Sequence, residues 1–213
     1  MLGAFFLYKK TVFIIVPLLI ISLVFNGIQF SNNKAYEAYL TEELNNMVSS
    51  LSSSILKSEE ILLDVVEQKQ LTKEQADDLY KYLRSVGLYH QEILFLGQKT
   101  KKIAAGSSEV SNRTATELMP QLRRYLQHFF DENAEETATY SLSKNDLKNI
   151  ENIVIMSVEI ADVVRANIPG ASTSGMPSEY WNDPKVRNSV NEQYWINVLK
   201  AIDQYSFHTL VYY

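Results

Sequence analysis

The sequence contains no cysteine, and it has only seven glycines and five prolines among its 213 residues. Without cysteine the chain has neither disulfides nor thiolate metal sites, so a folded domain depends on its own hydrophobic core. Few glycines and prolines favour long uninterrupted helices over a turn-rich β-sandwich. Hydrophobic residues make up 46% and charged residues 21%, a composition typical of a folded protein rather than a disordered one.

Charged side chains of either sign are scarce near the N-terminus. Lys9 and Lys10 are the only ones before Lys34, so the other 18 basic residues and all 25 acidic residues come later. The later part therefore carries 18 minus 25, or −7, charges. A domain of that sign lacks the basic surface that nucleic acid or anionic lipid requires, so nucleic acid is excluded as a partner.

An uncharged apolar segment follows the two lysines. From Thr11 to Asn33 there are 23 residues without a charge. As a helix rising about 1.5 Å per residue it spans roughly 34 Å, enough to cross a hydrocarbon core of about 30 Å. Because positive charges favour the cytoplasmic side, the sequence predicts a single-pass membrane protein with a cytoplasmic N-terminus.

This topology divides the chain into three parts. Residues 1–10 are expected to form a short cytoplasmic tail, residues 11–31 a transmembrane signal anchor, and residues 32–213 an extracytoplasmic helical-bundle domain. The alternative for the apolar segment is a cleaved signal peptide, which needs small residues at alternating positions after the apolar run. Residues 25–33 are bulky and polar instead, which favours a retained anchor.

Apolar residues at three-and-four spacing predict five helices after the apolar segment, starting near residues 32, 72, 114, 143 and 183. Thr72 and Thr114 each begin a capping-box pattern, and Ser143 is expected to cap the fourth helix. Asp183 followed by Pro184 resembles an N-cap before a proline at the first helical position. The predicted fold class is all-α: an N-terminal transmembrane helix followed by an up-and-down bundle of four to five helices.

The sequence offers little to support catalysis. His90, His128 and His208 lie on different predicted helices, so no pair has metal-ligand spacing on one helix face. His90 lies on an apolar stripe and is expected to be partly buried with a satisfied hydrogen bond. No nucleophile-elbow motif or glycine-rich phosphate loop is present. The sequence therefore predicts no catalytic residue, no metal site and no cofactor.

One long segment is rich in helix-breaking residues and ends in two large aromatics. Residues 168–181 contain two prolines and two glycines, and they close with Tyr180 and Trp181. Loops of this length are uncommon unless they carry function or are mobile. Exposed aromatics suit a binding surface, so Tyr180 and Trp181 are the predicted binding residues. The alternative is that both rings fold back and close the end of the bundle.

These observations predict a membrane-anchored extracytoplasmic interaction or ligand-sensing module that acts without catalysis. Its expected partners are the membrane, through one N-terminal span, and another membrane or surface protein. With about ten cytoplasmic residues, the chain is not expected to transduce a signal alone. The alternative function is a cell-surface enzyme, or an enzyme accessory subunit, with an unrecognised site.

Overall fold

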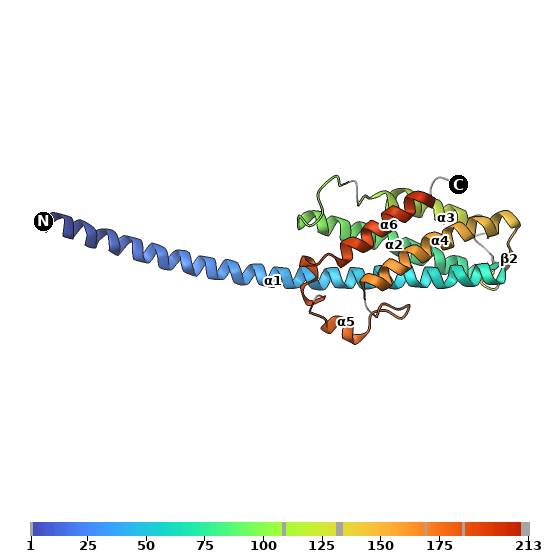
Figure 1. Cartoon of the computed structure of the whole chain (residues 1–213), viewed down its shortest axis with the longest axis horizontal. Helices are drawn as coiled ribbons and strands as arrows, with labels where there is room; N and C mark the ends of the chain where they lie inside the picture. The colour runs from blue at the N-terminus through green and yellow to red at the C-terminus, as the bar shows by residue number, and fades with distance from the viewer. Residues whose placement is uncertain (1, 108–109, 131–133, 169, 185, 210–213) are drawn as a thin grey trace. The chain divides into compact units, whose positions relative to one another are not determined.

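The computed structural model describes residues 2–107, 110–130, 134–168, 170–184 and 186–209. Its described part is mostly helical, and the helices pack against one another, in agreement with the predicted all-α class (Figure 1). The chain divides into two compact units, residues 1–40 and residues 41–213. The elements follow in this order: α1 (Leu2–Gln68), β1 (Gln70–Thr72), α2 (Lys73–Lys99), η1 (Thr114–Leu118), α3 (Met119–Gln127), β2 (Thr139–Ser141), α4 (Lys144–Asn167), α5 (Ser178–Asn182), η2 (Val186–Asn191) and α6 (Tyr194–Thr209).

The N-terminal unit consists of the first part of α1. Every side chain from Ile15 to Tyr39 is exposed, including Leu23 at 70% and Phe25 at 67%. Apolar side chains gain free energy when they leave water, at roughly 25 cal/mol per Å². Length and composition therefore make this helix a possible membrane span, although a signal sequence would have the same features. The prediction of one long N-terminal apolar helix is confirmed.

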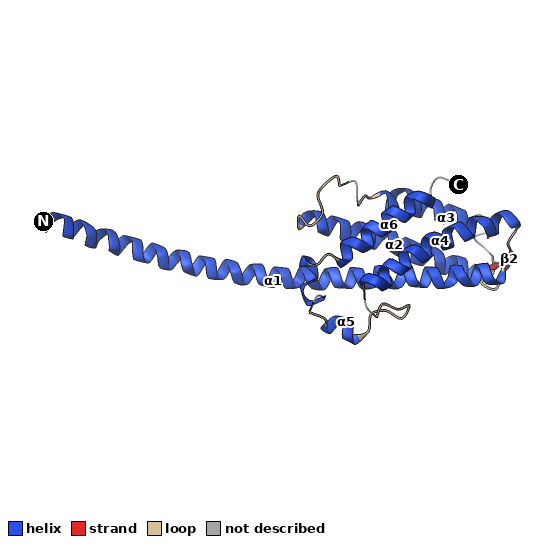
Figure 2. Cartoon of the chain, viewed as in Figure 1, coloured by secondary structure: helices blue, strands red, loops and turns tan. Residues whose placement is uncertain are grey.

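The second unit holds the hydrophobic core. The part of α1 from residue 41 onward buries one face, whose members recur every three or four residues. Side chains from α1, α2, η1, α4 and α6 meet around a small apolar cavity of about 20 Å³. The helices account for nearly all of the regular structure in this unit (Figure 2). The cavity is lined by Ile55, Ser58, Leu83, Val86, Leu118, Met156, Ser157, Ile160 and Ile202.

Two of the predicted helix starts are confirmed by reciprocal hydrogen bonds. The Gln75 N–H donates to Thr72 Oγ1 at 3.1 Å, and the Thr72 N–H donates to Gln75 Oε1 at 3.0 Å, which together begin α2. The same arrangement begins α4, where Ser143 and Asp146 exchange hydrogen bonds of 3.2 and 3.1 Å. Caps of this kind contribute about 1 kcal/mol each, because they satisfy N–H groups that the first helical turn leaves unpaired.

The predicted capping box at Thr114 is wrong. The chain from Thr114 to Leu118 forms a π-helical turn, and α3 starts at Met119 with no side-chain cap. Thr114 is 1% exposed, and its hydroxyl donates to the Asp203 carboxylate at 2.7 Å instead of accepting from the backbone. A tertiary hydrogen bond to α6 has therefore replaced the local cap.

The predicted helix start at Asp183 and Pro184 is also wrong. Asp183 ends α5, and its N–H donates to the Tyr180 carbonyl at 3.1 Å. The 3₁₀-helix η2 follows, with non-helical backbone angles at Asn188, so α6 starts only at Tyr194. The chain thus makes the short 3₁₀-helix η2 and then the longer helix α6 where the sequence pattern predicts one helix.

The structure contains one short pair of antiparallel strands that the sequence does not predict. In it β1 pairs with β2, with Leu71 opposite Tyr140. Leu71 is completely buried. Strands of three residues are too short to show an alternating pattern, so the sequence gives no periodic signal for them.

Candidate binding site beside the short helix α5

The segment predicted as an irregular loop folds back on itself before α5. A tight turn joins Ser172 and Gly175, and the Gly175 N–H donates to the Ser172 carbonyl at 3.1 Å. Gly170 has a φ of +80°, and a Cβ there would lie 2.7 Å from Pro177 Cγ. Only glycine fits this close approach with that backbone conformation. Residue 169, which belongs to the predicted loop, lies outside the described residues.

The two predicted binding residues lie in different environments. Tyr180 is 4% exposed, whereas Trp181 is 38% exposed. Both belong to α5, where consecutive side chains point about 100° apart. Their rings meet edge to face, with 5.2 Å between centroids and 81° between planes. The structure therefore places the Tyr180 ring inside the domain and leaves the adjoining Trp181 ring open to solvent.

A cleft of about 660 Å³ lies beside α5. This volume falls within the range of roughly 300–1,000 Å³ that is common for small-molecule sites. Tyr180 lines the cleft, and the remaining walls come from the end of α4, the loop before α5, the start of η2 and the start of α6. Its lining residues are Ala166, Asn167, Gly170, Pro177, Glu179, Tyr180, Asp183, Val186, Glu192, Gln193, Tyr194 and Asn197.

A buried hydrogen-bond network fixes Tyr180 in the cleft wall. Its hydroxyl lies 3.2 Å from the hydroxyl of Tyr194. The Tyr194 hydroxyl in turn lies 3.0 Å from Ser189 Oγ and 3.2 Å from Asn45 Oδ1. Asn45 also donates to the carbonyl of Val186 at 2.9 Å, which links α1 to η2. Asn45, Ser189 and Tyr194 were not predicted as site residues, because Asn45 lies 144 positions before Ser189 and 149 before Tyr194.

Among the residues that the structure describes, the charged groups of the cleft are all acidic. Glu179, Asp183 and Glu192 line it, and no lysine, arginine or histidine belongs to the described lining. Burial raises the pKa of Tyr180, and the neighbouring Tyr194 hydroxyl and Asp183 carboxylate raise it further. Burial also raises the pKa of Tyr194. Both phenols therefore stay neutral at physiological pH, so the cleft presents hydroxyl groups beside carboxylates.

A second polar cluster is enclosed in the core between α2, η1 and α6. Asp203 is 3% exposed and accepts hydrogen bonds from the Thr114 hydroxyl and from the Ser111 N–H. His90 is completely buried, with Nε2 3.4 Å from Asp203 Oδ1. His90 and Asp203 are both buried, and their contacts join α2, α6 and the segment at Ser111 and Thr114. We interpret the cluster as a structural link between the helices.

The hydrogen bonding expected of His90 is not found in the described structure. Neither ring nitrogen has a partner of regular hydrogen-bond geometry among the described residues. Burial lowers the pKa of His90, an effect that the Asp203 carboxylate and the Leu199 backbone partly offset. His128 is exposed, and the side chain of His208 lies outside the described part. Among the residues searched, no three histidine or acidic side chains converge as metal ligands would.

Comparison with protein-family models, curated protein sequences and solved structures yields no match to this chain.

Proposed function

We propose that this protein is a membrane-anchored extracytoplasmic helical module that recognises a partner protein or ligand and acts without catalysis. The observation that carries the proposal is the cleft of about 660 Å³ beside α5. It is lined by Tyr180, which makes edge-to-face contact with the exposed ring of Trp181. A fixed aromatic wall next to an exposed aromatic side chain suits recognition, since aromatic residues dominate the energetics of protein interfaces.

The membrane anchor of this proposal is the apolar part of α1. Its side chains from Ile15 to Phe30 are exposed, and a bilayer is the environment that such a surface favours. Lys9 and Lys10 precede the apolar run, which supports a cytoplasmic N-terminus and a domain outside the cytoplasm. The bulky and polar residues at 25–33 favour a retained anchor over a cleaved signal peptide.

For the domain itself we propose an up-and-down bundle. Its long members are the part of α1 from residue 41 onward, α2, α4 and α6. Four residues connect α1 to α2, a length that favours antiparallel neighbours. The short segments α3, α5 and η2 are additions to this frame, and α5 contributes to the cleft.

The charge of the cleft favours a basic partner segment. Three carboxylates and two neutral phenols line it, a set that accepts hydrogen bonds from a lysine or arginine side chain. Trp181 adds an exposed aromatic face, on which a guanidinium or an apolar side chain stacks favourably. We therefore expect another membrane or surface protein to present a basic residue to this site.

Site-specific photo-crosslinking tests the proposal in membranes of the native host. A photoreactive phenylalanine analogue at position 181 should give a discrete adduct with one protein. The same analogue at Phe95, which is 45% exposed on α2, is the matched control and should give none. Adducts of equal yield at both positions, or none at position 181, would contradict the proposed recognition surface.

A pair of substitutions separates recognition from packing. Trp181→Ala should reduce the yield of the partner on co-purification while leaving the melting temperature within about 2 °C, because its ring is partly exposed. Tyr180→Phe keeps the buried ring and removes only the hydroxyl that meets Tyr194. A large fall in melting temperature for Trp181→Ala, with partner yield intact, would leave Trp181 only a packing role.

A further inference from the structure

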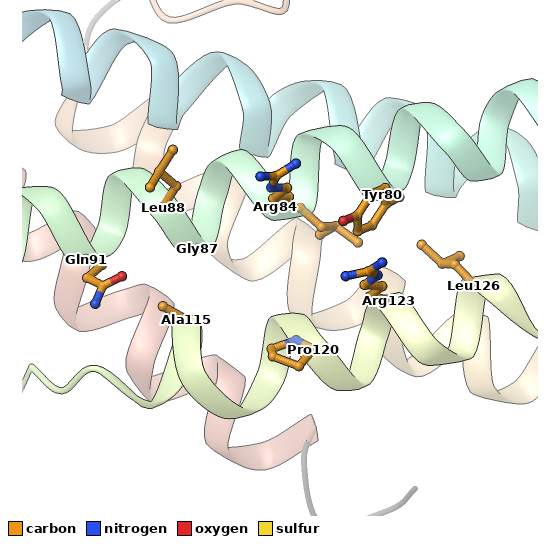
Figure 3. Close-up of a pocket in the computed structure, with 10 residues that line it drawn as sticks. Tyr80, Arg84, Gly87, Leu88, Gln91, Ala115, Pro120, Arg123 and Leu126 are labelled. Atoms are coloured by element: carbon orange, nitrogen blue, oxygen red, sulfur yellow. The ribbon is translucent and has the colours of Figure 1, made fainter.

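A second hollow lies between α2 and the η1–α3 segment, away from the α5 cleft. Its volume is about 280 Å³. Tyr80 and Arg84 come from α2, and Arg123 and Leu126 come from α3 on the opposite side (Figure 3). Leu83 and Leu88 add apolar surface from α2. We call this hollow the arginine pocket.

The two arginines of the pocket have no counter-ion in the described structure. Neither Arg84 nor Arg123 forms an ion pair with any carboxylate in the described ranges. By contrast, Arg113 pairs with Glu117 at 2.9 Å, and Arg165 pairs with Glu59.

An aromatic ring helps to hold one of these arginines at the pocket. The Arg123 guanidinium lies over the Tyr80 ring, 5.1 Å from its centroid. This cation–π contact favours one position of a long side chain without neutralising its charge. The positive charge therefore remains available to an anion in the pocket. Arg84 and Arg123 are both exposed, so an anion can reach them from solvent.

We propose that the arginine pocket binds a small organic acid. Its carboxylate would accept hydrogen bonds from Arg84 and Arg123, whose planar donors match carboxylate geometry. Its apolar body would pack against the leucines of the pocket and the Tyr80 ring. The volume lies at the lower limit of small-molecule sites, which favours a ligand with a single ring or a short chain.

The test uses the full chain in an uncharged detergent and three probes: benzoate, phenylacetate and hexanoate. Binding is measured by calorimetry and by the rise in unfolding temperature, with benzamide as the neutral analogue of benzoate. At least one acid should bind and benzamide should not, because the arginines recognise the carboxylate. No binding by any of the three acids overturns the proposal. Inorganic phosphate that binds as tightly as the best acid also overturns it, since phosphate has no apolar body.

A charge-matched pair of variants locates the binding. The double substitution of Arg84→Gln and Arg123→Gln should weaken the best acid at least about tenfold, since it removes two charge-assisted hydrogen-bond partners. The control removes two charges elsewhere, through Arg113→Gln and Arg124→Gln, and should retain the affinity. Neither control residue lines the pocket. Equal weakening in both variants would mean nonspecific attraction and would contradict the proposal.

The same variants distinguish a ligand site from a structural role. Because Arg84 and Arg123 have no described ion-pair partner, their replacement by glutamine should lower the unliganded melting temperature by no more than about 4 °C, the change expected from losing the Arg123–Tyr80 contact. Loss of acid binding together with a melting temperature within this limit supports a binding role. A larger fall in melting temperature would instead show that the arginines stabilise the α2–α3 contact, which would contradict the proposal.

Discussion

Replacing His90 with glutamine should change how the stability of the domain depends on pH. His90 is completely buried, and burial lowers its pKa in the folded protein. The unfolded chain exposes the same imidazole, whose ordinary pKa is about 6.5. As pH falls below that value, the unfolded state binds a proton that the folded state does not bind. The folded state is therefore favoured above about pH 6.5 and loses that advantage as the solution becomes more acidic.

The size of the effect follows from this linkage. Each pH unit below about 6.5 removes up to roughly 1.4 kcal/mol of unfolding free energy, until the lowered native pKa of His90 is reached. Between pH 7.5 and 5.5 the unfolded pKa of about 6.5 sets an upper bound of about 1.4 kcal/mol on this loss. Other groups also titrate in this range, so the informative quantity is the difference between native protein and variant. His90→Gln has no imidazole at this position, so its stability does not contain this pH-dependent contribution. The difference in unfolding free energy between the native protein and His90→Gln should therefore be smaller at pH 5.5 than at pH 7.5, by up to that amount.

Urea unfolding of the full chain in detergent, followed by circular dichroism at pH 7.5 and 5.5, measures this difference. His128→Gln is the matched control, because it removes an exposed imidazole and should leave the pH dependence close to that of the native protein. Parallel curves for native protein and His90→Gln would refute the reasoning. A deficit that grows at low pH would mean that Asp203 stabilises a protonated His90 in the core.

Two further substitutions test the packing directly. Gly97→Ala would place a Cβ 2.7 Å from Ile103 Cδ1 and 3.1 Å from Trp195 Cη2. Overpacking should therefore outweigh the gain in helix propensity and lower the free energy of unfolding by about 1 kcal/mol in thermal unfolding. An unchanged or higher melting temperature would contradict this. Glu59→Gln removes the buried partner of Arg165, whose own side chain is 48% exposed. This substitution should lower the free energy of unfolding in urea by about 1–2 kcal/mol, a value between those typical of surface and buried ion pairs. A decrease below about 0.3 kcal/mol would show that solvent screens the pair.

Local features of the fold were predictable from the sequence. The caps at Thr72 and Ser143 join residues three positions apart, so the pattern that predicts them contains both partners. The apolar helix at the N-terminus was also predictable, because its length and hydrophobicity are properties of one continuous segment.

Features that depend on distant partners were not predictable. Thr114 has the residue pattern of a cap, but its hydroxyl bonds to Asp203, which lies 89 positions later. Tyr194 and Asn45 meet in the cleft network although they lie 149 positions apart. A single sequence gives no signal for such pairs. The cleft beside α5 forms only where the end of α4, the loop before α5, η2 and the start of α6 meet, so only the aromatic residues of α5 could be anticipated.

The arginine pocket also depends on residues that are distant in the sequence. Arg84 and Arg123 lie on separate helices, and the sequence alone gives no reason to expect them in one hollow. Nor does the sequence show which arginines have partners. Arg113 and Glu117 are four positions apart on one helical turn, so their pairing is local. The absence of a described partner for Arg84 and Arg123 emerges only once the helices are placed together.

The most direct test of the account is the membrane topology of the intact chain. Alkaline phosphatase, which is active only outside the cytoplasm, is fused after Tyr213, and the fusion is expressed in a bacterial host. A second fusion at the same position carries a fluorescent reporter that is active only in the cytoplasm. The account predicts an active phosphatase fusion in the membrane fraction, with the N-terminal segment retained as the anchor. A phosphatase that is inactive in the membrane, or a released soluble form that begins near Ser31, would contradict it.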